Sequence, residues 1–96
     1  MIHIPKKVKI GPLEYAICPL NGDEDDYWGR HDFEVLEIRL KTDMARPQLE
    51  IIYLHEVLHA MDKTYCGNSL LEKQIRSLSF GLYDFLKSNK IFEDKK

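Results

Sequence analysis

Residues 55–60 read HEVLHA, in which two histidines four positions apart bracket a glutamate. On an α-helix, His55 and His59 lie one turn apart on one face, where both imidazoles can bind a single cation. Glu56 is rotated from His55 by roughly 100° about the helix axis, so it can reach a water molecule on that cation without ligating the cation itself. Zinc lowers the pKa of such a water toward neutrality, and Glu56 can accept the proton as a general base. The pattern therefore predicts metal-assisted hydrolysis of a peptide bond.

The residues around the motif favour the metal site over an alternative, in which His55 is a buried hydrogen-bonded residue and His59 a surface one. Burying two histidines and a glutamate without partners would be costly, and a metal ion removes that cost. The helix is expected to be buried because it is apolar almost all round, through Ile51, Ile52, Leu54, Val57, Leu58 and Met61.

A catalytic zinc site takes three protein ligands and keeps the fourth position for water. Tyr65 stands where the extended metzincin motif has its third histidine. The remaining histidines are His3 and His31, and the alternative third ligand is a carboxylate from the next helix. Glu72 fits best, because a short connection makes the two helices antiparallel neighbours. Its competing role is to complete a capping box with Ser69 at the start of that helix.

Alternation of polar and apolar residues predicts two strands, 6–10 and 13–20, joined as a hairpin. The acidic, glycine-containing segment 21–32 is expected to be a solvated loop rather than a calcium site, because it lacks the EF-hand spacing. Residues 33–41 form the third predicted strand. Its core-facing residues should be Leu36, Ile38 and Leu40.

The histidine helix should run from about Arg46 to about Tyr65. Proline is tolerated only in the first turn of a helix, so Pro47 places the start near Arg46. Thr42 or Asp43 is the expected N-cap. Gly67 and Asn68 should end the helix, because both residue types adopt positive φ readily.

The second helix should begin after Ser69 and stop near Asn89, with a frayed tail beyond Phe92. Its predicted core stripe consists of Leu71, Ile75, Leu78, Leu82 and Phe85. The expected fold is α+β: a small antiparallel three-stranded sheet packed against two antiparallel helices, in a single domain of residues 1–96.

Composition narrows the classes of partner. Of the 96 residues, 44% are hydrophobic, and the net charge is −2 with the two signs well mixed. This balance gives no reason to expect nucleic acid or a membrane surface as a partner. The N-terminus lacks a secretory pattern, so we expect a cytoplasmic protein. Cys18 and Cys66 are then unpaired thiols that are buried or half-buried.

The segment HEVLHAM, followed by EKQIRSLSFGLYDFLKSN, resembles the small phage- and prophage-encoded zincin-like metallopeptidases, which are distantly similar to ImmA/IrrE-type and other gluzincin-like domains. The resemblance extends over nearly the whole chain, including the KVKIGPLEYAI hairpin and a Trp-Gly loop. It implies a minimal zincin-like core with Zn²⁺ as cofactor. His55, His59 and Glu72 match the metal ligands, and Glu56 matches the catalytic base. Arg76 departs from the pattern, which has an acid or a small polar residue there.

Several further residues are candidates for contacts with an oxyanion or with substrate. His31 could line the cleft, although a loop histidine in solvent is the alternative. Tyr65 and Tyr83 are oxyanion-donor candidates, with simple packing as the alternative. Arg76 could bind a substrate carboxylate, or could be a solvated surface residue. Asp62 could orient a metal ligand from behind, or could be an exposed helix acid.

The substrate is expected to be a peptide or protein that pairs with the edge of the strand Phe33–Leu40. A chain of this size offers little cleft wall, so a homodimer or a partner chain could complete the site. The alternative function is a catalytically silent, zinc-stabilised interaction or regulatory module of phage or mobile-element origin. Glu56 favours catalysis, because a structural zinc site needs no base beside its histidines.

Overall fold

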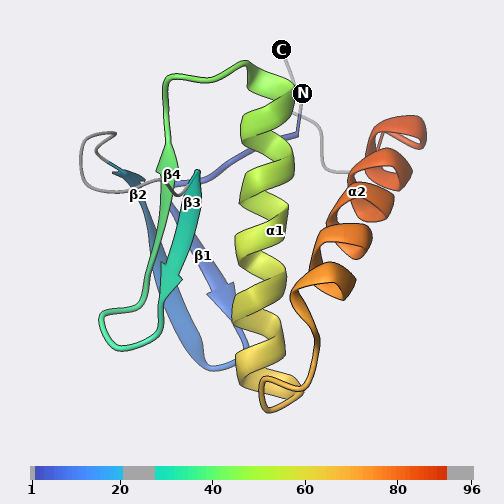
Figure 1. Ribbon diagram of the computed structural model, residues 1–96. Helices are drawn as coiled ribbons and strands as arrows, with labels where there is room; N and C mark the ends of the chain where they lie inside the picture. The colour runs from blue at the N-terminus through green and yellow to red at the C-terminus, as the bar shows by residue number, and fades with distance from the viewer. Residues whose placement is uncertain (1, 21–27, 91–96) are drawn as a thin grey trace.

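The computed structural model describes residues 2–20 and 28–90 and has an α+β fold, as predicted (Figure 1). The acidic residues 23–26, Tyr27 and the tail beyond residue 90 lie outside the described residues. The elements, in chain order, are β1 (Lys7–Ile10), β2 (Leu13–Leu20), β3 (Gly29–Asp32), β4 (Glu37–Lys41), α1 (Arg46–Tyr65) and α2 (Glu72–Ser88).

The sheet has four strands in the order β1-β2-β4-β3 and is mixed, so the prediction of three antiparallel strands is wrong. β1 and β2 form the predicted antiparallel hairpin. β4 lies between β2 and β3, parallel to β2 and antiparallel to β3. β3 is therefore an edge strand, and it arises from residues that the sequence placed in a loop.

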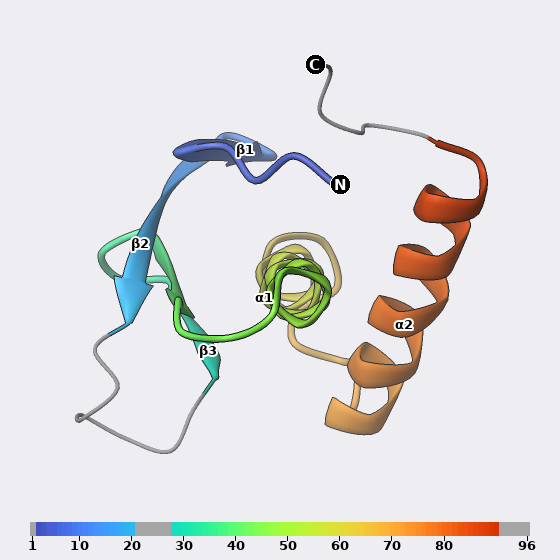
Figure 2. The same ribbon diagram turned by 90° about the horizontal axis from the view of Figure 1, so that it is seen from above.

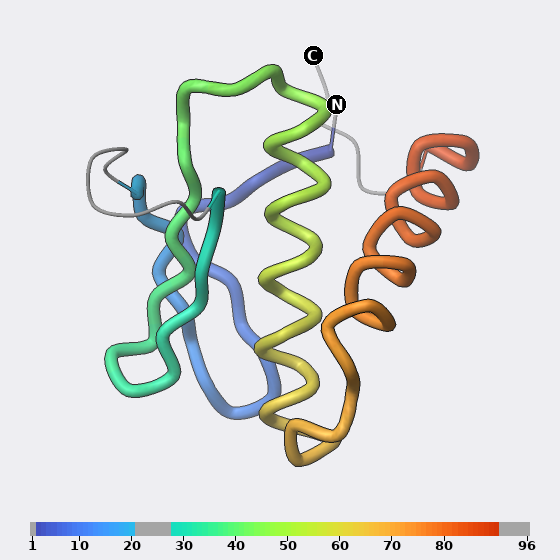
Figure 3. Tube along the Cα trace, in the orientation of Figure 1, coloured from blue at the N-terminus to red at the C-terminus, as the bar shows by residue number. Residues whose placement is uncertain are grey.

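A tight turn divides the predicted strand 33–41. The backbone N–H groups of Glu34 and Val35 donate to Oδ1 of Asp32 at 3.0 and 3.4 Å, which is an Asx turn. Leu36 then adopts φ = 55°, in the left-handed region. These two features reverse the chain between β3 and β4 (Figure 3). Ile38 and Leu40 of β4 are buried, as predicted, whereas Leu36 is only half-buried.

Helix α1 is the centre of the molecule. Viewed from above, the sheet curves around α1, and α2 lies on the opposite side of α1 (Figure 2). The two helices are antiparallel, as predicted, but α2 covers α1 rather than the sheet. This position explains the apolar character of α1 on nearly every side. The core is formed by Ile2, Ile10, Tyr15, Ile38, Leu40, Tyr53, Leu54, Val57, Ala60 and Leu86.

The limits of α1 agree with the prediction, but its expected cap does not. The helix begins at Arg46 and ends at Tyr65, followed by Gly67 and Asn68 at φ = 63° and 62°. Neither Thr42 nor Asp43 caps it, because the N-cap residue is Ala45 without a side-chain hydrogen bond. The first turn is instead held by a buried carboxylate.

That carboxylate belongs to Glu50, whose side chain is 1% exposed. Its Oε2 accepts a hydrogen bond from Nε of Arg46 at 2.8 Å and from the backbone N–H of Ile2 at 3.2 Å. Arg46 also donates to the carbonyl oxygen of Ile2 at 2.7 Å. The pairing satisfies the buried charge and fastens the N-terminal segment to α1.

The buried face of α2 differs from the predicted stripe. Ile75, Ser79 and Leu86 are buried and Leu82 is partly buried. The predicted stripe members Leu71, Leu78 and Phe85 are between 51% and 64% exposed. Serine can take a core position here because its hydroxyl donates to the carbonyl oxygen of Arg76 at 2.8 Å.

Cys18 and Cys66 are both free thiols, but Cys66 is exposed rather than buried or half-buried. Within the described part of the chain, neither helix combines the length and the hydrophobicity needed to cross a bilayer.

Candidate metal centre

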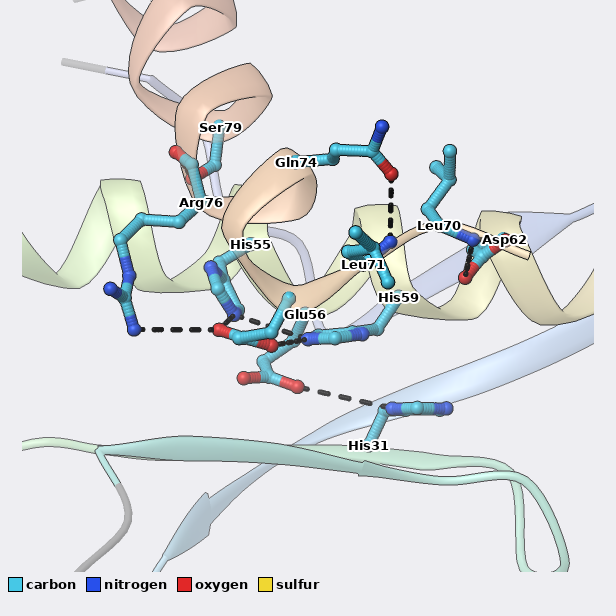
Figure 4. A network of polar contacts seen from close by, with 11 residues as sticks. His31, His55, Glu56, His59, Asp62, Leu70, Leu71, Gln74, Arg76 and Ser79 are labelled. Carbon is cyan, nitrogen blue, oxygen red and sulfur yellow. Dashed lines mark hydrogen bonds and ion pairs between the residues drawn. The ribbon is translucent and has the colours of Figure 1, made fainter. Parts of the chain in front are cut away.

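Three predicted ligands converge on one point between the two helices. Nε2 of His55 and Nε2 of His59 lie 3.1 Å apart on one face of α1. Glu72, the first residue of α2, places its Oε2 3.0 Å from the His55 nitrogen and its Oε1 2.9 Å from the His59 nitrogen. All the ligand atoms lie within 4.8 Å of one another. The rings face the same space as Arg76 and Glu56 (Figure 4).

The close triangle of two ring nitrogens and one carboxylate has no consistent hydrogen-bonding pattern of its own. If both rings carry a proton on Nε2, each can donate to Glu72, but two N–H groups then face each other at 3.1 Å. If one nitrogen instead accepts from the other ring, its lone pair faces a carboxylate oxygen. A cation at the centre satisfies all three groups at once. Tetrahedral zinc with ligand bonds of 2.0–2.1 Å separates its ligands by about 3.3 Å, close to the distances here.

Glu72 owes its position to Asp62, which is 4% exposed near the end of α1. The Asp62 carboxylate accepts hydrogen bonds from the backbone N–H groups of Ser69 at 3.1 Å and Leu70 at 3.3 Å. Asp62 is therefore neither an exposed acid nor a direct partner of a metal ligand. It fixes the connection that delivers Glu72 to the histidines.

The expected capping box of Ser69 and Glu72 does not form. The N-cap residue of α2 is Leu71, and its backbone N–H donates to Oε1 of Gln74 at 2.8 Å. Ser69 lies outside the helix, with its N–H committed to Asp62. Because Gln74 takes the capping role, the Glu72 carboxylate is available to the histidines.

Glu56 is buried beside this triangle, with 6% of its surface exposed. Burial, and secondarily the negative charge of Glu72, raise the pKa of the Glu56 carboxyl from 4.5 to about 7. A carboxyl with this pKa can both accept and release a proton near neutral pH. A buried group with a perturbed pKa in a cavity is also typical of functional sites.

His31 lies in β3 and forms the opposite wall of the site. Its ring stacks on that of His59, with centroids 5.7 Å apart and planes 8° from parallel. Its Nδ1 is 3.9 Å from Oε1 of Glu56. Burial, together with His59 and Lys63, lowers the pKa of His31 despite the opposing effect of Asp32, and this shift favours the neutral imidazole. The structure thus places His31 in the cavity rather than in solvent.

The pKa of His55 is also lowered, chiefly by burial, although the neighbouring carboxylate of Glu72 acts in the opposite direction. Neutral imidazole is the form of histidine that binds a metal ion, because protonation removes the lone pair that makes the bond. The environment of His55 therefore favours the ligating form.

Gly29 allows β3 to approach α1 closely, and sequence reasoning missed this role. A Cβ atom at position 29 would lie 2.6 Å from Cγ2 of Ile52 and 3.2 Å from Cγ of Glu56. Any side chain there would displace Ile52, Glu56 or the strand itself. The available signal was a glycine within an extended segment, which often marks close backbone approach.

A solvent-open cavity of about 700 Å³ surrounds the site. Its lining includes His31 and Arg76 but neither Tyr65 nor Tyr83. The ring of Tyr65 instead lies beside Gly11, and Tyr83 packs against the core. The edge strand along the cavity is β3, rather than the predicted Phe33–Leu40. The lining residues are Trp28, Gly29, Arg30, His31, Ile51, Ile52, His55, Glu56, His59, Glu72, Arg76, Ser79 and Phe80.

Comparisons of this chain with protein-family models, with curated proteins and with solved structures found no match.

Proposed function

We propose that this protein is a zinc-dependent peptide hydrolase in which His55, His59 and Glu72 hold Zn²⁺ and Glu56 is the general base. The observation that carries the proposal is the position of the ligand triangle. It lies in the wall of an open cavity, with a buried carboxyl beside it. The sequence resemblance to phage-encoded zincin-like metallopeptidases supports the same assignment.

Zinc bound at this position would polarise a water molecule and the carbonyl group of a peptide bond. Glu56 accepts the proton of the attacking water and then delivers it to the nitrogen of the leaving amine. Glu56 can act in both steps because its carboxyl lines the cavity beside the three ligands and is not itself a ligand. Its near-complete burial limits the orientations of the carboxyl.

His31 has two roles in this proposal. Its stacking on His59 restricts the rotation of a ligand ring. Its neutral imidazole also faces the cavity from β3, where a ring N–H can donate to a carbonyl oxygen that gains negative charge during attack. Gly29 supports both roles by letting β3 lie close to α1.

The alternative function, a zinc-stabilised module without turnover, has one structural argument in its favour. Glu72 belongs to α2 and the histidines to α1, so a bound metal would fasten the two helices together. A closed structural zinc site normally has four protein ligands, however. Among the described residues, only these three side chains form a group that could hold a metal.

Metal analysis combined with digestion of a peptide library tests the proposal. We expect one zinc per chain, loss of zinc in His59→Ala, and loss of cleavage with zinc retained in Glu56→Gln. Glu14→Gln is a matched control, because it makes the same substitution on an exposed residue of β2. Zinc binding without cleavage of any peptide by the wild type would refute hydrolysis and favour the module.

A further inference from the structure

We propose that the site acts on the C-terminal end of peptides, with Arg76 binding the free α-carboxylate and an apolar pocket accepting the last side chain. This inference rests on the proposed function and adds to it a substrate class: peptides with a free C-terminus and a bulky apolar last residue.

The cavity extends from the ligands mainly toward the start of α1. On the other side of His59, the amino group of Lys63 lies 5.0 Å from the centre of the Phe33 ring. This contact connects α1 to the β3–β4 turn. The connection between the helices is closed by Asp62 as described above. Neither Lys63 nor Phe33 lines the cavity. The cavity thus lies on one side of the ligands, and the exposed residues Lys63 and Phe33 lie on the other side, outside it.

The pocket side is predominantly apolar. Ile51 and Ile52 stand one helical turn before His55 and Glu56 on α1, and Phe80 stands two turns after Glu72 on the antiparallel α2. Trp28, just before β3, completes this end. The Trp28 and Phe80 side chains are 52% and 53% exposed, so a ligand side chain that covers them gains hydrophobic stabilisation.

Arg76 lines the cavity beside the ligands, with its guanidinium directed toward the Glu72 carboxylate (Figure 4) and its side chain 64% exposed. Arg30 of β3 is the second arginine in the cavity lining. The guanidinium nitrogen of Arg76 lies 3.8 Å from Oε2 of Glu72, and Oε2 would lie about 2 Å from a bound zinc. The guanidinium is therefore within about 6 Å of the metal position. One extended residue spans about 3.3–3.6 Å, so a carboxylate one residue beyond the carbonyl of the cleaved bond would fall within reach of Arg76.

The apolar walls decide between two sources of that carboxylate. An aspartate or glutamate side chain could pair with Arg76, but it would leave the apolar surfaces of Ile51 and Phe80 uncovered. A C-terminal residue instead presents its α-carboxylate to Arg76 and its side chain to the apolar surfaces. Arginine and a carboxylate form charge-assisted and frequently bidentate hydrogen bonds, which gives this interaction its geometric specificity.

The reaction is hydrolysis of the last peptide bond. The water oxygen bonds to the carbonyl carbon, the carbon–nitrogen bond breaks, and Glu56 moves the water proton to the departing nitrogen. The products are a shortened peptide with a new C-terminal carboxylate and one free apolar amino acid. No oxidant, reductant or further reactant is required.

Binding to the Glu56→Gln variant tests the inference without turnover. The chain contains a single tryptophan, Trp28, whose fluorescence reports occupancy of the pocket. Three short peptides differ only at the end: a C-terminal phenylalanine with a free carboxylate, the same peptide as its amide, and one ending in glycine. We expect the first to bind at least about tenfold more tightly than either of the others. An otherwise identical amidated peptide carrying an internal aspartate tests the side-chain source.

Two variants assign the effect to residues. Arg76→Met should remove the preference for the free carboxylate, and Phe80→Ala should reduce the preference for phenylalanine over glycine. Lys73→Met is the matched control, because Lys73 is an exposed cation of α2 outside the cavity lining. Equal binding of acid and amide, tighter binding of the internal aspartate peptide, or an unchanged preference in Arg76→Met would each overturn the inference.

Products from the zinc-loaded wild type separate this inference from the proposed function. Release of single C-terminal residues supports both. Cleavage of internal bonds in peptides with blocked ends supports hydrolysis and overturns the end-directed inference. Selective binding of the free carboxylate without cleavage retains the binding assignment and refutes hydrolysis.

Discussion

Because Glu56 is buried, ionisation of its carboxyl should measurably destabilise the folded, metal-free protein. The pKa of this carboxyl rises from 4.5 to about 7, and the side chain is 6% exposed. Each pKa unit corresponds to about 1.4 kcal/mol, so ionised Glu56 should destabilise the fold by about 3 kcal/mol. Removing the charge with Glu56→Gln should therefore stabilise the metal-free protein at alkaline pH.

The direction of this stability change and the pH range in which it occurs follow from the linkage between proton binding and folding. Below pH 4.5 the carboxyl is neutral in both the folded and unfolded chains, and its full contribution to stability is present. As pH rises from 4.5 to about 7, the unfolded chain loses the proton first, so the stability of the wild type falls. Above pH 7 the loss is complete. Glu56→Gln lacks this decline.

Urea denaturation in the presence of a chelator measures the effect. We expect the stability of Glu56→Gln relative to wild type to increase by about 3 kcal/mol between pH 4 and pH 8. Glu14→Gln, on the exposed side of β2, should show no such trend. A pH-dependent difference below about 1 kcal/mol would show that Glu56 is solvated, and would refute the burial argument.

Four further substitutions test how the fold is packed around the site. Gly29→Ala should destabilise the protein by about 1–3 kcal/mol, because its Cβ would lie 2.6 Å from Cγ2 of Ile52; an unchanged urea midpoint would contradict that close approach. Asp62→Ala should cost about 1–3 kcal/mol and weaken zinc binding measured by calorimetry, since it frees two backbone N–H groups near Glu72. Ile75→Ala should cost about 2–5 kcal/mol, whereas Leu78→Ala should stay within about 0.5 kcal/mol by thermal denaturation; the reverse order would restore the predicted stripe.

The features that sequence reasoning predicted well depend on local signals. Pro47, Gly67 and Asn68 mark both ends of α1, since each constrains the backbone directly. The spacing of His55 and His59 places both rings on one face of any helix. The placement of Glu72 near the histidines was predicted from the short connection between the helices, because in neighbouring antiparallel helices the start of the second lies beside the end of the first.

The features that were wrong depend on partners distant in sequence or on a single side chain. Asp32 converts an apparently continuous strand into a turn, although Phe33 and Val35 are strong strand formers. Asp62 takes the N–H of Ser69 seven residues away and so prevents the expected cap. Parallel pairing of β2 with β4 is a long-range arrangement that no local pattern specifies.

The difference between the predicted and the observed buried face of α2 has a similar origin. Ser79 reads as a surface residue, but its hydroxyl bonds within the helix and allows it to pack against α1. The predicted stripe used only apolar residue types and therefore included Leu78 and Phe85, which are exposed. Hydrophobicity alone could not distinguish these two faces.

X-ray absorption at the zinc edge of the loaded protein tests the central claim most directly. We expect one zinc per chain with two imidazole nitrogens and a carboxylate oxygen at about 2.0–2.2 Å, and loss of one imidazole in His59→Ala. A shell that contains sulfur at about 2.3 Å, from Cys18 or Cys66, would contradict the claim, as would a wild-type protein that binds no stoichiometric zinc.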